Sequence, residues 1–214
     1  MRPSPGSTQT PTDTVYDGLV SRYLNRRLSR PIARALGHTP VTPNQVSIFS
    51  LLVASGALAA FATGYPIVGG VLAQASSVID GVDGDLARIT GKASAFGGFL
   101  DAILDRYADG LVLLGLAIWA AGESDATTTW IAGFAALAGA YIVTYTRARI
   151  SETHRTLFDK GITSLASRDV RLFVVFIGAI AGQGFATLIF LAVLTNAVVL
   201  LRLLSARAVF RAAG

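Results

Sequence analysis

Apolar residues run in long blocks along most of the chain, from Gln45 to Leu204, and short polar stretches separate the blocks. A helix needs about 20 mostly apolar residues to cross the hydrocarbon core of a bilayer. The pattern therefore predicts an all-α, polytopic membrane protein. Its six expected transmembrane helices cover roughly residues 45–64, 67–90, 95–121, 127–150, 168–183 and 185–206.

The segment before these blocks has a different pattern. Residues 1–12 are rich in proline, serine and threonine, and we expect them to be disordered. Over residues 13–41, apolar side chains recur at helical spacing among arginines, which predicts an amphipathic helix on the cytoplasmic face of the membrane, with a bend near Pro31. Residues 42–214 are expected to form one membrane domain, with Thr42 capping its first helix.

Composition supports a membrane protein and excludes some kinds of site. Of the 214 residues, 52% are hydrophobic and 14% are charged. The chain has no cysteine, so disulfides and thiolate metal sites are excluded. Its 22 glycines suit helices that pack closely in a membrane. No small-residue cleavage site follows the first apolar block, so no secretory signal peptide is expected.

The net charge of +5 follows the membrane pattern and does not indicate a nucleic-acid partner. Basic residues gather before the first predicted span and between the fourth and the fifth, whereas the short turns at 64–66, 123–125 and 182–184 have none. By the positive-inside rule, both chain ends and the polar surface near them are expected on the cytoplasmic side of the inner membrane.

Aspartates concentrate in residues 80–110, a region that is otherwise strongly apolar. Helical spacing places Asp80 and Asp83 on one stripe of the second span, and Asp101 and Asp105 on one stripe of the third. We expect the two stripes to face each other across a turn near Gly91. Carboxylates inside a membrane need a cationic partner. An all-oxygen cluster suits Mg²⁺ or Mn²⁺, and four carboxylates suffice for two ions, a pairing suited to phosphoryl displacement.

Not every charge in this region has to belong to such a site. Asp85, Arg106 and Asp109 lie near the ends of the predicted spans and are interpreted as charges that extend toward water at the membrane surface.

The acidic region also carries a resemblance. The spacing Asp80-x2-Asp83-Gly84-x2-Ala87-Arg88-x8-Gly97-x3-Asp101-x3-Asp105 matches the signature of the CDP-alcohol phosphotransferase (CDP-alcohol phosphatidyltransferase) family, and "TPNQVS" at 42–47 is similar to the family's entry into its first span. The resemblance implies a homodimer and a transferase that binds two divalent ions through Asp80, Asp83, Asp101 and Asp105.

The same resemblance implies how the reaction runs. Asp105 would also be the general base that deprotonates the acceptor hydroxyl, which then attacks the β-phosphorus of a CDP-alcohol and releases CMP. Nucleotide-binding roles are implied for the remaining residues of the signature, with Gly84 leaving room for the cytidine and Arg88 meeting the nucleotide or its phosphates. These residues are Gly84, Ala87, Arg88 and Gly97.

The acceptor has to be inferred from a second cluster. Arg147, Arg149, Arg168 and Arg171 lie at the cytoplasmic edge of the fourth and fifth spans. One interpretation is that they only reflect the excess of basic residues found at the cytoplasmic side of membrane proteins. The other is that they form a pocket for a phosphorylated polyol, since arginine binds phosphate with two parallel hydrogen bonds.

Three functions are compatible with the sequence. The N-terminal segment and "SRDVRLF" at 167–173 resemble the branch that joins CDP-inositol to inositol phosphate and makes di-inositol phosphate phosphate. A phospholipid synthase that uses CDP-diacylglycerol or an ether-lipid analogue, with inositol phosphate or glycerol phosphate, is the alternative. A cation transporter or channel would also carry intramembrane carboxylates, but here they crowd to one side of the bilayer.

Overall fold

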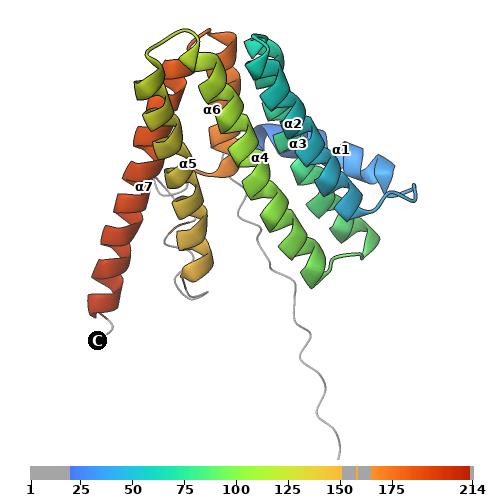
Figure 1. The fold of residues 1–214 in the computed structure, drawn as a ribbon. Coiled ribbons are helices and arrows are strands. Elements are labelled where there is room, and N and C mark those ends of the chain that lie inside the picture. The colour runs from blue at the N-terminus through green and yellow to red at the C-terminus, as the bar shows by residue number, and fades with distance from the viewer. Residues whose placement is uncertain (1–19, 151–157, 159–164, 213–214) are drawn as a thin grey trace, which may run out of the picture.

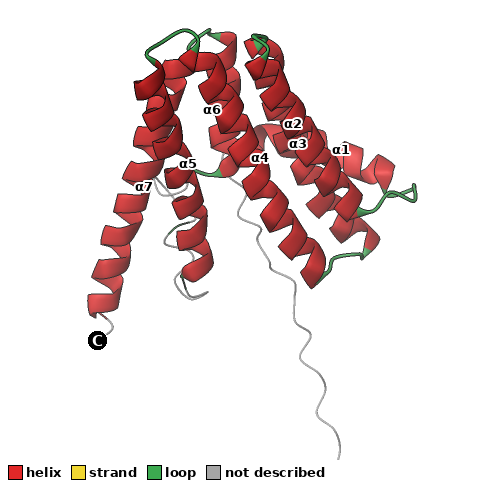
Figure 2. Cartoon of the chain, viewed as in Figure 1, coloured by secondary structure: helices red, strands yellow, loops and turns green. Residues whose placement is uncertain are grey.

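The computed structural model describes residues 20–150, 158 and 165–212, so the predicted disordered segment 1–12 and the start of the predicted N-terminal helix lie outside the described residues. Within that part the chain consists of helices and loops without strands, which confirms the all-α prediction (Figure 2). A π-helical turn, η1 (Ser21–Asn25), leads into α1 (Arg26–Leu36). The long helices follow: α2 (Pro43–Ala62), α3 (Pro66–Thr90), α4 (Ala95–Ala121), α5 (Ala126–Arg149), α6 (Arg168–Ile180) and α7 (Gly184–Ala212).

These helices agree with the predicted spans to within a few residues, except that α7 continues six residues beyond 206. Length and apolar composition qualify three stretches of the described chain to cross a membrane: Pro43–Ala62, Ala126–Arg149 and Gly184–Ala208. Of the other helices, α3 and α4 carry the aspartates, and α6 has only 13 residues. The count of six transmembrane helices therefore stays a prediction.

Helix α2 is the element that joins the two acidic helices, because it packs along both α3 and α4. Helix α6 packs on the other side of α3, and α5 pairs with α7 (Figure 1). Close approach of α2 and α4 depends on Gly115, where a Cβ atom would lie 2.8 Å from the Cα atom of Leu58. The start of α2 is fixed by the predicted cap, since Thr42 and Gln45 form a reciprocal capping box.

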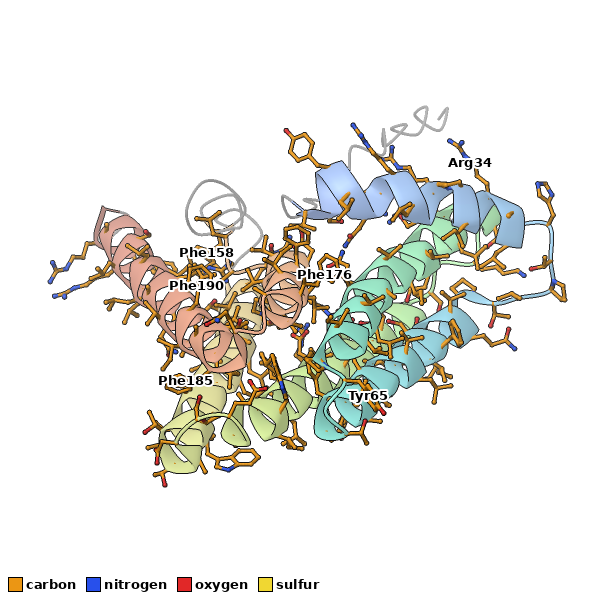
Figure 3. The ribbon with its side chains drawn as sticks, turned by 90° about the horizontal axis from the view of Figure 1, so that it is seen from above. Arg34, Tyr65, Phe158, Phe176, Phe185 and Phe190 are labelled. Carbon is orange, nitrogen blue, oxygen red and sulfur yellow. The ribbon has the colours of Figure 1, made fainter. Side chains whose placement is uncertain are left out.

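Helix α1 lies across α3, outside the group of long helices (Figures 1 and 3). It runs through Pro31 as one helix without a break, and the irregular turn lies earlier, at η1. The face against α3 consists of small residues, with Ser29 and Ala33 fully buried. The large apolar side chains of this segment stay exposed, as do Arg27, Arg30 and Arg34; they are Tyr23, Leu24, Leu28 and Ile32.

Candidate active site

The turn between α3 and α4 brings the two acidic stripes together, as the sequence predicted. Gly91 ends α3 in the left-handed conformation, with φ of 65°, which glycine adopts without steric cost. The Lys92 N–H donates to the Ala87 carbonyl across this end. Ser94 then caps α4 by accepting from the Gly97 N–H at 3.0 Å. The cytoplasm-facing ends expected for the two helices are therefore held side by side.

Three aspartates converge where the stripes meet. One carboxylate oxygen from each of Asp80, Asp101 and Asp105 lies within 4.8 Å of the other two. Arg168 from the start of α6 reaches into this group, with Nη1 at 2.7 Å from Asp80 Oδ2 and 3.1 Å from Asp105 Oδ1. The carboxylates of Asp80 and Asp105 repel each other, and the guanidinium between them reduces this repulsion.

Asp83 joins the same region from a more buried position. Its side chain lies against Asp101, and its Oδ2 accepts a short hydrogen bond from the Ser47 hydroxyl of α2. Only 6% of Asp83 is exposed. The structure therefore groups three of the four predicted metal ligands directly, with the fourth behind Asp101 and oriented by Ser47.

The donor set fits a hard divalent cation. All donors in the group are carboxylate oxygens, which Mg²⁺ and Mn²⁺ prefer, and no described histidine belongs to it. Residues that would hold such an ion are Asp80, Asp101 and Asp105, with Asp83 adjacent. How many ions the group takes does not follow from this arrangement.

Two cavities open on the acidic cluster and share one wall. The first, of about 220 Å³, lies between the start of α2 and the α3–α4 turn, and the second, of about 380 Å³, lies toward α6 and the N-terminal helix. Four residues line both: Asp83, Gly84, Arg88 and Asp101. Two different molecules can therefore meet at the same carboxylates from opposite sides.

The predicted nucleotide-binding residues all line the first cavity. It contains Gly84, Ala87, Arg88 and Gly97, together with polar side chains that the sequence did not single out: Asn44, Ser47, Lys92 and Ser94. The Arg88 guanidinium lies over Gly84, where an added Cβ atom would be 3.6 Å from Arg88 Nη2. An alanine methyl group at position 84 would therefore make ordinary van der Waals contact with this guanidinium.

Two of the four predicted acceptor arginines line the second cavity and two do not. Arg147 and Arg168 line the second cavity, while Arg149 is an exposed residue outside it. Arg171 is 4% exposed and points away from the cavity into an ion pair, with Nη2 at 2.5 Å from Asp109 Oδ2. It also donates to the Ala166 carbonyl.

The interpretation of Asp85 and Asp109 as charges that extend toward water is wrong. Asp109 is 2% exposed and lies among Arg171, Arg168 and Arg106, because α6 and α4 bury it between them. Asp85 is 8% exposed and binds Arg26 and Arg88 at 2.7 Å each. Arg26, Arg168 and Arg171 lie in distant segments, so spacing along one helix gave no signal for their contacts. The pairs Asp85–Arg88 and Arg106–Asp109 are three residues apart on one helix, a spacing that the sequence does show. Arg106 is also partly buried, with Nη2 at 3.6 Å from both Asp105 and Asp109.

Comparisons with known proteins identify the family of this chain. The profile of the CDP-alcohol phosphatidyltransferase family matches residues 40–201. A bifunctional IPC transferase and DIPP synthase from Rubrobacter xylanophilus is 42% identical over 189 residues, which are 88% of this chain and 42% of that protein. A phosphatidylinositol phosphate synthase from Mycobacteroides abscessus is 36% identical over 169 residues, or 78% of this chain and 75% of that protein. The chain thus spans less than half the length of the bifunctional relatives.

Solved structures give the same result. The phosphatidylinositol phosphate synthase of Mycobacterium tuberculosis with CDP-DAG bound has a TM-score of 0.69 and 29% identity, covering 83% of this chain and 92% of that chain. The same enzyme in complex with manganese and citrate also has a TM-score of 0.69 and 29% identity, covering 82% and 87%. With the signature, the fold and the profile in agreement, the chain belongs to the CDP-alcohol phosphatidyltransferase family.

Proposed function

We propose that this chain is a metal-dependent transferase that moves a substituted phosphate group from a CDP-alcohol to an acceptor hydroxyl and releases CMP. The observation that carries the proposal is the carboxylate group of Asp80, Asp101 and Asp105, which lines the second cavity and reaches the wall shared with the first cavity through Asp101. The donor's cytidine diphosphate occupies the cavity lined by the signature residues, and the acceptor occupies the other. Both then reach the carboxylates of Asp83 and Asp101, which line both cavities.

In the proposed reaction, Asp105 takes the proton of the acceptor hydroxyl, which makes the oxygen a competent nucleophile. That oxygen attacks the β-phosphorus, the bond from the β-phosphorus to the bridging oxygen breaks, and CMP leaves. Divalent ions held by the four aspartates would neutralise the phosphate oxygens and the charge that develops on CMP. Arg88 lies at the shared wall and is assigned to the donor's phosphates.

We assign CDP-inositol as donor and inositol phosphate as acceptor. Support comes from the bifunctional relatives, whose name includes DIPP synthase, and from the arginines of the second cavity. A phospholipid synthase is the second candidate, and one feature favours it. An apolar cavity of about 470 Å³ lies between α1, α2 and α3 and has the character of an acyl-chain site. It is lined by Ile32, Leu36, Val41, Gln45, Val46, Phe49, Ile79 and Val82.

One assay distinguishes these functions. Purified protein with Mg²⁺ or Mn²⁺ is incubated with CDP-inositol or CDP-diacylglycerol and with inositol phosphate or glycerol phosphate, and CMP and the mass of the product are measured. We expect CMP release with one donor, complete loss in excess EDTA and recovery when metal is restored. Absence of CMP with every pair, together with cation flux in liposomes, would identify a channel instead. Full turnover in EDTA would remove the metal assignment.

For the acceptor, the proposal assigns the phosphate to Arg147 and Arg168. Arg147→Ala is expected to raise the acceptor KM about tenfold with little change in the donor KM, because one charged hydrogen-bonding group is lost. Arg149→Ala, two residues further along α5 and outside the cavity, is the matched comparison and is expected to have a smaller effect. Equal effects of the two variants would favour the reading in which these arginines serve only membrane orientation.

The proposal extends to the membrane setting. The six long helices cross the inner membrane, both chain ends and the site face the cytoplasm, and the N-terminal helix lies on the membrane surface. Its support is the distribution of basic residues and the exposed apolar and arginine side chains of α1. A homodimer is proposed on the family resemblance alone. The domain division, with residues 42–214 as the transferase domain, rests on the profile match over residues 40–201.

A further inference from the structure

Asp85 lies within the acidic signature but does not face the acidic cluster. It is on α3, one residue after Gly84, and its carboxylate is directed toward α1. Its Oδ1 accepts from Arg26 Nη1 and from Arg88 Nη2, each at 2.7 Å, and its Oδ2 accepts from the Ser29 hydroxyl at 3.0 Å. Both oxygens of this buried side chain are therefore engaged.

The contact with Arg88 has a consequence for the shared wall of the two cavities. Arg88 is the most exposed member of the group, with 48% of its side chain accessible, and an arginine side chain has many rotamers. Because Asp85 Oδ1 holds Nη2, the guanidinium folds back over Gly84 and remains in the lining of both cavities. An anionic ligand would then meet Arg88 already oriented.

Arg26 determines whether that arginine can still attract an anion. If Asp85 and Arg88 formed an isolated pair, their charges would cancel. Arg26 is bound to the same oxygen, so two guanidiniums share one carboxylate, and Asp85 offsets only part of the positive charge of the two arginines. Arg26 also lines the second cavity, together with Ser21 and Asn25 of η1.

The N-terminal segment is fixed in this place by buried hydrogen bonds. Asn25, 2% exposed, donates to Ser77 Oγ at 2.9 Å and accepts from Gln74 Nε2 at 2.9 Å, both on α3. The backbone N–H of Ser21 donates to Asp169 Oδ2 of α6 at 2.6 Å. The segment η1 is thus attached to α3 and α6, two of the helices that line the second cavity.

From these contacts we propose that Asp85 is a positioning residue for the donor. It acts through Arg88, with Arg26 as its counter-charge, so that the N-terminal helix takes part in binding the diphosphate of the CDP-alcohol. The proposal rests on the proposed function. Removing the negative charge leaves two guanidiniums that repel each other, and Arg88 leaves the cavity wall.

The test is a double-mutant cycle measured by CMP release, with KM determined separately for donor and acceptor. Asp85→Asn is expected to raise the donor KM about tenfold while the acceptor KM stays within about twofold, since the lost contact is charge-assisted and acts on the donor side. In the Arg88→Gln background, Asp85→Asn should produce no further rise, because its effect passes through Arg88. Asp85→Glu, which keeps the charge, should restore part of the affinity.

A merely structural role, in which Asp85 only attaches α1 to α3, gives different results. In that case Asp85→Asn would raise the KM of both substrates, or would raise the donor KM by the same factor in the wild-type and Arg88→Gln backgrounds. Either result overturns the proposal. A donor KM in Asp85→Asn equal to that of the wild type also overturns it. Ser29→Ala removes the hydrogen bond to Asp85 Oδ2 and keeps both guanidinium contacts. It should lower the melting temperature, because α1 is held less firmly, and leave the donor KM unchanged. Asp125→Asn, at the exposed cap of α5, is the matched charge control.

Calorimetric titration with CDP in the presence of Mn²⁺ separates this inference from the proposed function. If the wild type releases no CMP from any donor yet binds CDP, the function fails, and weaker CDP binding by Asp85→Asn still supports the positioning role. If CDP binding is the same in wild type and Asp85→Asn, the positioning role is refuted whatever the activity.

Discussion

Replacing Asp105 by asparagine is expected to reduce transfer by about 10²–10⁴-fold, the range for loss of a general base. The amide has the shape of the carboxyl group but cannot take the acceptor's proton. Arg168 keeps its contacts with Asp80 and Asp109, so the fold should be retained. CMP release measured at saturating donor and acceptor gives the loss in kcat, and the melting temperature reports whether the fold is intact.

Two further measurements decide what that loss means. Mn²⁺ binding, followed by electron paramagnetic resonance, should weaken but persist, because Asp80 and Asp101 remain in the group. Abolished metal binding would show that Asp105 acts mainly as a ligand. Turnover at the wild-type rate would contradict both roles and leave the acceptor without an identified base.

Removal of the buried carboxylate of Asp109 is expected to have the largest effect on stability. Asp109→Leu leaves the 4%-exposed Arg171 without its carboxylate, and breaking a buried ion pair from one side costs about 3–5 kcal/mol of unfolding free energy. The double variant Asp109→Leu with Arg171→Met should recover most of this loss, since well-packed apolar residues replace buried pairs at little cost. Denaturant titration in detergent measures the difference.

The same pair of variants separates two roles for Arg171. If the double variant is stable and its acceptor KM is unchanged, Arg171 supports the fold through Asp109. A raised acceptor KM in a stable double variant would show that acceptor binding needs Arg171, or needs Arg168 held by Asp109. A loss of less than about 1 kcal/mol in Asp109→Leu alone would show that water reaches the ion pair and screens it.

The sequence allowed the helices and the core of the site to be predicted because both depend on local order. Apolar block lengths determine helices such as α4, whose predicted and observed limits agree at Ala95 and Ala121. Four-residue spacing placed Asp101 and Asp105 on one stripe, and the glycine at position 91 indicated the turn that brings Asp80 near them.

What was missed depends on contacts between distant segments. Arg168 lies 63 residues beyond Asp105 along the chain, and only the packing of α6 on α3 brings its guanidinium into the acidic group. The apolar stripe of the N-terminal segment predicted an amphipathic helix on the membrane but did not show which of its residues contact the protein. The structure buries Ser29 and Ala33 there, because α1 approaches α3 closely and small residues permit this.

The two cavities that share Asp83, Gly84, Arg88 and Asp101 bear on the order of events in the proposed reaction. Each substrate has its own compartment, so neither has to depart before the other arrives. The nucleophile and the leaving group can lie on opposite faces of one phosphorus atom. Transfer in a single displacement then needs no phosphorylated form of the protein, and no side chain has to carry the group between the two compartments.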